Sequence, residues 1–259
     1  MLVLSMEREI LFKREAQVAE ITLNRPDKGN AMTRGMVDRL ASIAAEIDRD
    51  RTMKAVVIRA RGKFFCTGGD IAAWGALTPD EMSREWILPG IDALERIAAL
   101  PQPVIAAISG HAVGGGLELA MAADFRIAVR SAKLSAPEVA LGMISGWMGV
   151  RRVAELAGVA RARELMLLGM PIDAEKALDW GLLTAVADDA ADMDRQIGVW
   201  LERLCANSSE AMALTKGILA SMRADMRHHH ASAAAQAAAS EDCREGVRAF
   251  LEKRRPTFK

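Results

Sequence analysis

The stretch His111-Ala-Val-Gly-Gly-Gly-Leu-Glu118 decides the fold assignment of this 259-residue chain. Three glycines open an apolar helical pattern, and a carboxylate follows about one turn inside it. Glycine lets a ligand approach the backbone closely, and the first amides of a helix lack intrahelical partners and lie at the positive end of its dipole. The stretch therefore predicts a pocket that binds an oxyanion beside an acid. A tight loop packed against neighbouring backbone gives the same pattern, so other motifs must support the assignment.

Two other loops provide this support. Ala55–Ala60 has the pattern of a buried strand and leads into the second glycine loop, Phe64–Asp70. Val104–Ile108, another short apolar run, leads into the first glycine loop in the same way. Two strand-to-helix turns with exposed amides can face one carbonyl oxygen from two sides. A second acid, Glu138, precedes a further glycine-bearing loop at 141–146.

Together these motifs resemble the enoyl-CoA hydratase/isomerase (crotonase) family. The resemblance covers nearly the whole chain. Its matching blocks are Asn24-Arg25-Pro26 with Asn30-Ala31, Phe65–Ile71, Gly110–Ala120, Pro137-Glu138 with Leu141-Gly142, and the ending Ser240–Arg254.

The resemblance implies an α/β fold, namely a crotonase-like spiral of ββα turns followed by a helical C-terminal region. We expect residues 1–200 to form the spiral core and residues 201–259 to form the helical C-terminal trimerisation region. The local patterns agree with strand–helix alternation in the first two thirds. They predict strands at Val18–Leu23, Ala55–Ile58 and Val104–Ile108, and helices at Thr33–Asp48 and Arg84–Ala99. From about Gly149 onward the patterns predict only helix, with Ala231–Leu251 as one element.

By position, the resemblance places an oxyanion hole at the Gly69 and Gly115 amides, which would hold the thioester oxygen of an acyl-CoA. It makes Glu118 and Glu138 the catalytic acids. Adding water across a double bond conjugated to a thioester needs one group to activate the water and a proton for the α carbon. Negative charge develops on the thioester oxygen, and removing one amide that stabilises it typically costs about 2.7 to 4 kcal/mol. We therefore expect an enoyl-CoA hydratase, a lyase, that works on this thioester without a metal or a separate cofactor.

The resemblance also suggests residues that contact the substrate or its CoA portion. These are Arg25, Lys28, Ala31, Gly68, Asp70, Ile71, Gly146, Trp147, Phe250 and Lys253. The chain departs from the family where many relatives have a small residue and a glycine, because Trp147 and Met148 stand there. Both side chains could simply fill the core. If they line the pocket instead, the acyl group could differ from a simple straight chain.

Two other functions are compatible with the same scaffold. The first is an enoyl-CoA double-bond isomerase. Isomerases of this family commonly use one principal acid, whereas both Glu118 and Glu138 are kept here, which favours hydration. The second is a noncatalytic or RNA-binding protein of the crotonase fold. Lys plus Arg and Asp plus Glu are equal at 34 each, which argues against binding to nucleic acid.

Composition points to a cytoplasmic protein. The three cysteines, Cys66, Cys205 and Cys243, have no paired spacing, which argues against disulfides and a zinc site. No stretch reaches the roughly 20 apolar residues that span a bilayer. Three histidines at 228–230 are adjacent, so on a helix they point about 100° apart and do not converge on a metal. The resemblance further implies a homotrimer or a dimer of trimers.

Overall fold

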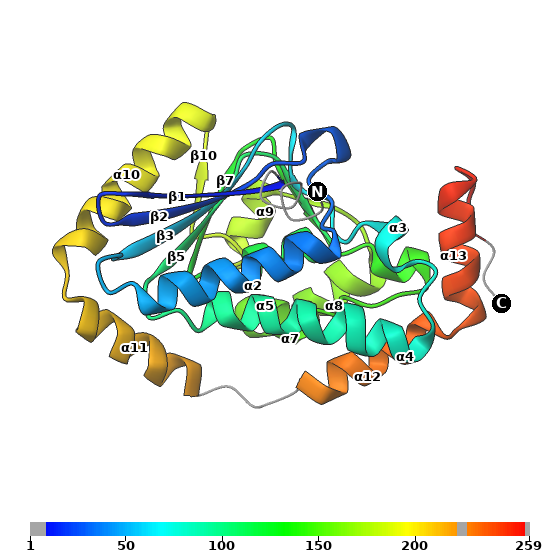
Figure 1. The fold of residues 1–259 in the computed structure, drawn as a ribbon. Coiled ribbons are helices and arrows are strands. Elements are labelled where there is room, and N and C mark those ends of the chain that lie inside the picture. The colour runs from blue at the N-terminus through cyan, green and yellow to red at the C-terminus, as the bar shows by residue number, and fades with distance from the viewer. Residues whose placement is uncertain (1–8, 222–226, 257–259) are drawn as a thin grey trace.

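In the computed structural model, which describes residues 9–221 and 227–256, strands form two sheets and helices pack around them (Figure 1). The large sheet has six described strands in the order β1-β2-β3-β5-β7-β10. Only β1 and β2 pair antiparallel, and the other neighbours pair parallel. The strands are β1 (Ile10–Glu15), β2 (Val18–Leu23), β3 (Ala55–Ala60), β5 (Val104–Ile108), β7 (Phe125–Val129) and β10 (Ala185–Ala187).

The small sheet has four described strands in the order β4-β6-β8-β9. The first three pair parallel, and β9 pairs antiparallel with β8. These strands are β4 (Phe64–Cys66), β6 (His111–Val113), β8 (Lys133–Ser135) and β9 (Ile172–Asp173). Each strand of the small sheet from β4 to β8 directly follows a strand of the large sheet, so successive β-β units wind as a spiral. The α/β class and the predicted spiral of ββα turns are confirmed.

Helices cover the large sheet and extend the chain beyond it. Figure 1 shows α2 and α5 side by side across one face of the large sheet, and these two helices share many contacts. The described helices are α2 (Arg34–Arg49), α3 (Ile71–Trp74), α4 (Pro79–Glu81), α5 (Leu88–Ala98), α6 (Gly115–Met121), α7 (Gly149–Ala157), α8 (Val159–Leu168), α9 (Ala174–Asp179), α10 (Ala190–Ala206), α11 (Ser209–Ser221), α12 (Arg227–Ala238) and α13 (Glu241–Leu251). Short 3-10 turns occur at Pro26–Lys28 and Glu138–Leu141, and a π-helical segment, η2 (Met82–Ile87), joins α4 to α5.

The sequence pattern explains how α2 forms and packs. The Thr33 hydroxyl accepts a hydrogen bond from the Met36 amide and so caps the first turn. Met36, Leu40, Ile43 and Ile47 recur at helical spacing and are buried against the sheet. The strand β5 is buried along its whole length, as expected for a parallel strand that is covered on both faces.

The prediction that the chain is entirely helical after Gly149 was wrong. The strands β9 and β10 interrupt this region, and β10 extends the large sheet by pairing with β7. These strands have only two and three residues, too few to show a period-2 pattern.

The predicted single helix Ala231–Leu251 is divided into α12 and α13. Ser240 has extended backbone angles, and its hydroxyl caps α13 by accepting a hydrogen bond from the Cys243 amide. The predicted helix Arg84–Ala99 begins earlier, because Thr78 caps α4 and forms a capping box with Glu81 in the first turn of that helix.

Other sequence predictions are not settled by the fold. The proposed boundary at residue 200 lies inside α10, and the two-part division remains a prediction. The side chains of His228–His230 are outside the described part of the structure. Among the residues that are described, no helix is both long and apolar enough to cross a bilayer.

Asn30 ties the first part of the chain to the small sheet. Its side chain is fully buried and its φ is 55°, a left-handed conformation that asparagine tolerates better than most residues. Its amide nitrogen donates to the carbonyls of Arg61 and Phe64, and its Oδ1 accepts from the Arg25 amide, each at 2.8 Å. This network fixes the loop in which Met32 pairs with the segment around Gly69.

We expect Asn30→Ala to lower the free energy of unfolding by about 2 to 4 kcal/mol, because it leaves buried polar groups without partners and puts alanine at a positive φ. Urea denaturation monitored by circular dichroism measures the change. The control is Asn207→Ala, at an exposed helix end, which should change stability much less. Equal effects in the two variants would contradict this account.

Candidate active site

Three parallel strands of the small sheet bring the candidate residues together. β4, β6 and β8 are neighbours with the same direction, so their carboxyl ends lie at one edge of the sheet. Gly69 follows β4, Gly115 follows β6, and Glu138 follows β8. Glu118 lies one turn inside α6, which begins at Gly115. Residues spread over about 70 positions therefore meet through strand pairing.

The amides of Gly69 and Gly115 lie close together. A Cβ atom on Gly115 would be 3.4 Å from the Gly69 nitrogen, and one on Gly68 would be 3.3 Å from the Gly115 nitrogen. Gly114 has a φ of 54°, which turns the chain from β6 into the helix in a conformation that favours glycine. Within the described residues, neither amide donates a hydrogen bond to the protein. Both N–H groups are thus available to one acceptor.

Glu118 is buried and held by backbone donors. Its Oε1 accepts hydrogen bonds from the amides of Trp147 and Gly149, each at 2.7 Å. Met148, between these donors, has a φ of 72° although it is not glycine. This left-handed turn lets the two amides flanking Met148 reach the same oxygen, and strained conformations of this kind are common at functional sites. The buried Arg152 donates to the Trp147 carbonyl at 2.9 Å and supports the same turn.

Glu138 lies beside Gly114 and has fewer hydrogen-bond donors than Glu118. A Cβ atom on Gly114 would be 3.3 Å from its Oε1, which places the carboxylate beside the start of α6. Both of its oxygens are buried, and neither accepts a well-formed hydrogen bond from the described residues. The two acids therefore differ: Glu118 accepts two short backbone hydrogen bonds, whereas Glu138 has only weaker contacts with its own amide and the Ser145 hydroxyl.

The environment raises the pKa of both acids. Burial is the main cause for Glu118, and the nearby Glu138 adds to it, whereas the amides of Gly149 and Trp147 and the charge of Arg152 act in the opposite direction. Burial also raises the pKa of Glu138, against a smaller effect of its own amide and the Ser145 hydroxyl. Because each charge opposes the other, the pair favours a state with one ionised and one protonated carboxyl.

The four residues line one cavity of about 640 Å³. Most of the other residues suggested from the sequence line it as well: Lys28, Ala31, Gly68, Asp70, Ile71, Gly146, Trp147 and Phe250. Arg25 and Lys253 do not line it. The Arg25 guanidinium instead donates to Asp70 at 2.7 Å and to the Ala31 carbonyl at 3.0 Å, so it supports the wall from behind.

Two aromatic residues of the cavity were missed by the sequence analysis. Trp74 and Trp86 line it together with Trp147, and the ring centroids of Trp86 and Trp147 are 5.2 Å apart. Trp86 and Ile87 come from the π-helical segment η2, and such segments are frequent at functional sites. A pattern of single apolar residues in a helix gives no sign of this irregularity, so only the three-dimensional structure identifies them.

Cys66 and His111 lie near the site but contact other parts of the protein. Burial raises the pKa of the Cys66 thiol to about 12, so it stays protonated and is a poor nucleophile. The His111 Nδ1 accepts a hydrogen bond from the Lys133 amide at 3.0 Å, and its ring packs edge-on against Phe64. Neither side chain lines the cavity with the acids.

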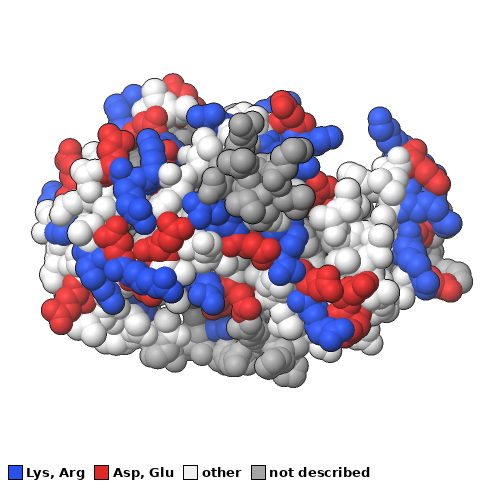
Figure 2. All heavy atoms as spheres, in the orientation of Figure 1, with Lys and Arg blue, Asp and Glu red and all other residues white. Residues whose placement is uncertain are grey.

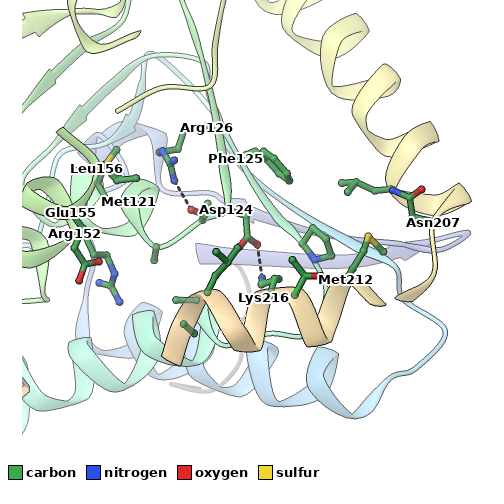
Figure 3. A pocket seen from close by; sticks show the side chains of 18 of the residues that line it. Met121, Asp124, Phe125, Arg126, Arg152, Glu155, Leu156, Asn207, Met212 and Lys216 are labelled. Atoms are coloured by element: carbon green, nitrogen blue, oxygen red, sulfur yellow. Dashed lines mark hydrogen bonds and ion pairs between the residues drawn. The ribbon is translucent and has the colours of Figure 1, made fainter. Parts of the chain in front are cut away.

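Another large cavity lies between α11 and the end of the large sheet (Figure 3). In Figure 3, Lys216 of α11 points to Asp124, and the two form an ion pair. The Arg126 guanidinium is also engaged, because it donates to the carbonyls of Leu182 and Ala123. Lys216, Asp124 and Arg126 in this second cavity are thus engaged with each other or with the backbone. We therefore place the candidate active site at Glu118 and Glu138.

Neither the surface charge in Figure 2 nor the arrangement of possible metal ligands indicates another functional site among the described residues. Basic and acidic side chains are interspersed over the face shown in Figure 2. In residues 9–221 and 227–256, no group of three or more His, Cys, Asp and Glu side chains is arranged to hold a metal ion.

Comparison with known proteins supports the interpretation of the motifs. A family model described as enoyl-CoA hydratase/isomerase matches residues 13–259. The chain is 37% identical to a Bacillus subtilis protein named "Probable enoyl-CoA hydratase", over 93% of this chain and 95% of that protein. It is 34% identical to the 1,2-epoxyphenylacetyl-CoA isomerase of Escherichia coli, over 96% and 97% of the two chains. The crystal structure of carnitinyl-CoA hydratase from Mycobacterium avium superposes with a TM-score of 0.84 at 32% identity, over 97% and 98%.

The buried and poorly hydrogen-bonded Glu138 carboxyl yields a stability prediction. Since its pKa is raised in the folded state, folding is opposed once the unfolded carboxyl ionises, and this penalty grows as pH rises towards the folded pKa. We expect Glu138→Gln to raise the melting temperature at about pH 8, by ~2 to 4 °C for each kcal/mol gained, and to have little effect at about pH 4. Calorimetry at the two pH values measures this, with the exposed Glu202→Gln as control. A lower melting temperature at the higher pH would contradict the assignment of a buried, poorly solvated carboxylate.

Proposed function

Because this chain belongs to the enoyl-CoA hydratase/isomerase family, we propose that it adds water across the 2,3 double bond of a 2-enoyl-CoA thioester, or catalyses the reverse dehydration. The observation that carries this proposal is the meeting of two free amides and two buried, unequal acids in one cavity. Hydration requires such a set, because it needs a site for the thioester oxygen, a base for water and an acid for carbon.

In the proposed reaction, the thioester oxygen accepts hydrogen bonds from the amides of Gly69 and Gly115. These donors stabilise the negative charge that develops on this oxygen as the enolate forms. The donors are fixed by strand pairing and by the start of α6, so they need little reorganisation during the reaction.

We assign the two acids different roles from their surroundings. Glu118, with two amide donors and the nearby Arg152 charge, acts as the ionised base that takes a proton from water. Glu138, which lacks such donors, acts as the protonated acid. The water oxygen bonds to C3, the electron pair of the double bond moves towards the thioester oxygen, and the proton of Glu138 passes to C2. The proton taken by Glu118 balances the one given by Glu138, and exchange with solvent restores both acids.

The substrate carries its own CoA, so the proposal includes no separate cofactor. Lys28 and Phe250 lie on the cavity wall, and we assign them to contacts with the CoA portion. Lys28 is exposed, so its cation can reach a phosphate group in solvent. Arg25 and Lys253 are assigned no direct contact within one chain, since neither lines the cavity.

An isomerase is the second candidate function. It is favoured by the family description, which includes isomerases, and by the similarity to an isomerase whose named substrate is another CoA thioester, 1,2-epoxyphenylacetyl-CoA. Double-bond migration needs the same oxyanion amides but only a proton moved between carbons. Product analysis separates the two, because hydration yields a 3-hydroxyacyl-CoA.

We also propose that the chain assembles as a homotrimer or a dimer of trimers in the cytoplasm. Large apolar side chains are exposed near the end of α8, with exposed fractions of 69% for Leu167, 63% for Leu168 and 63% for Met170. A patch of this kind is typical of a surface that is covered by a partner. Analytical ultracentrifugation measures the assembly, and a monomer at micromolar concentration would contradict it.

We expect Glu118→Gln and Glu138→Gln each to lower kcat for hydration of crotonyl-CoA by about a hundredfold to ten-thousandfold, because each removes a proton-transfer group. Loss of the conjugated-thioester absorbance measures the rate. Binding of butyryl-CoA should change little, since neither substitution alters the volume of the site. The exposed Glu202→Gln is the control and should retain full activity. Full activity in both site variants would overturn the assigned chemistry.

We expect a bell-shaped pH dependence of kcat/KM. The rate falls at low pH as the ionised acid is protonated and falls at high pH as the protonated acid ionises. Because burial raises the pKa of both acids, the low-pH limb should lie above the ordinary glutamate value of 4.5. A low-pH limb at that ordinary value would show that the working carboxylate is solvated, contrary to the proposal.

A further inference from the structure

We propose that Trp147 is a specificity-determining residue, whose indole closes the cavity between α5 and the start of α6 and limits the acyl group to a short chain. This inference rests on the proposed function, because it takes the thioester carbonyl to lie at the Gly69 and Gly115 amides.

The Trp147 side chain is fixed in place. It is 2% exposed, and its Nε1 donates to the Trp86 carbonyl at 3.3 Å. The backbone of Trp147 is also held on both sides of its Cα atom, since its amide donates to Glu118 and its carbonyl accepts from Arg152. An indole with this many anchors is a rigid wall, and moving it to admit a longer chain would break several contacts.

The indole fills the space between two helices. A Cβ atom on Gly90 of α5 would lie only 2.0 Å from Nε1 of Trp147, so the missing side chain at Gly90 forms the notch that receives the ring. At its other side the ring lies against α6, because a Cβ atom on Gly115 would be 2.8 Å from Cζ3. The route between α5 and α6 is therefore blocked by one side chain.

Trp86 extends the same wall to the other oxyanion glycine. A Cβ atom on Gly69 would lie 2.6 Å from Cζ2 of Trp86, and the Trp86 and Trp147 rings are in contact. Both glycines that face the thioester oxygen thus have an indole against them. An acyl chain that begins at this carbonyl meets aromatic surface within a few bonds.

A second route for the acyl chain must be considered. An apolar hollow of about 300 Å³ lies beyond Glu138 and Ile144, and these residues line both cavities. A chain that entered it would have to pack methylene groups against the buried, poorly hydrogen-bonded Glu138 carboxyl, and such contact with a polar group is unfavourable. We therefore expect Trp147, not Ile144, to set the chain length.

Calorimetric binding of butyryl-CoA and decanoyl-CoA tests the inference without any chemistry. Wild-type protein should bind decanoyl-CoA no more tightly than butyryl-CoA. Trp147→Ala should shift the ratio of the two affinities towards decanoyl-CoA by at least about tenfold, because the new space accepts extra methylene groups. Trp147→Phe, which keeps part of the ring, should shift it less. The control Trp200→Ala removes a tryptophan that packs on Phe125 outside the cavity and should leave the ratio unchanged.

Three results would overturn the inference: a wild type that already prefers decanoyl-CoA by tenfold, an unchanged ratio in folded Trp147 variants, or a larger shift in Ile144→Ala than in Trp147→Ala. If circular dichroism shows that Trp147→Ala is unfolded, Trp147→Phe alone must shift the affinity ratio towards decanoyl-CoA. An unchanged ratio in Trp147→Phe would then contradict the inference.

Crotonyl-CoA hydration by the same proteins separates this inference from the proposed function. The expected binding pattern without hydration refutes the function and leaves the role of Trp147 intact. Hydration with an unchanged affinity ratio refutes the role of Trp147 alone. Failure of wild-type protein to bind either thioester refutes both.

Discussion

Parallel pairing of the three short strands β4, β6 and β8 is the constraint on which the site depends. Each strand has only three residues, but each ends at the same edge of the small sheet. The loop after each strand delivers one component: the Gly69 amide, the start of α6, and Glu138. The large sheet and α2 add stability around this edge. Asn30 connects the loop before α2 to the start of the small sheet, because its side chain donates buried hydrogen bonds to the carbonyls of Arg61 and Phe64.

The same edge concentrates unfavourable electrostatics that suit proton transfer. Two carboxyl groups are buried near each other, and only Glu118 accepts two short backbone hydrogen bonds among the described residues. A fold selected for stability alone would not retain a buried acid with so few hydrogen-bond donors, because such a group opposes folding when it ionises. The left-handed turn at Met148 is a further local cost, and it positions the two amides that make Glu118 different from Glu138.

The sequence predicted the parts of this arrangement that leave a local signature. The glycines around 68 and 115 mark sharp turns and close backbone approach, and the strands before them are short apolar runs, so the family and the α/β spiral could be assigned. The positions of Glu118 and Glu138 followed from the same motifs, although their roles remain a proposal.

Other features depend on contacts between distant segments and have no such signature. The strand β10 exists because β7 offers it a pairing edge, and its three residues show no pattern by themselves. Trp86 lines the cavity because it lies in a π-helical segment, and Trp147 packs into the notch at Gly90. The sequence could not show whether these side chains pack in the core or line the pocket. Arg25 carries a charge suited to binding phosphate, but its guanidinium forms an ion pair with Asp70 instead.

Isotope uptake during turnover is the most direct measurement of the central claim, that two buried acids add water to an enoyl thioester held by two amides. Crotonyl-CoA is incubated with the protein in water enriched in oxygen-18 and deuterium, and the product is analysed by mass spectrometry. The account predicts a 3-hydroxyacyl-CoA with one labelled oxygen at C3 and one deuterium at C2. Deuterium uptake without oxygen uptake, or unlabelled substrate after prolonged incubation, would contradict it.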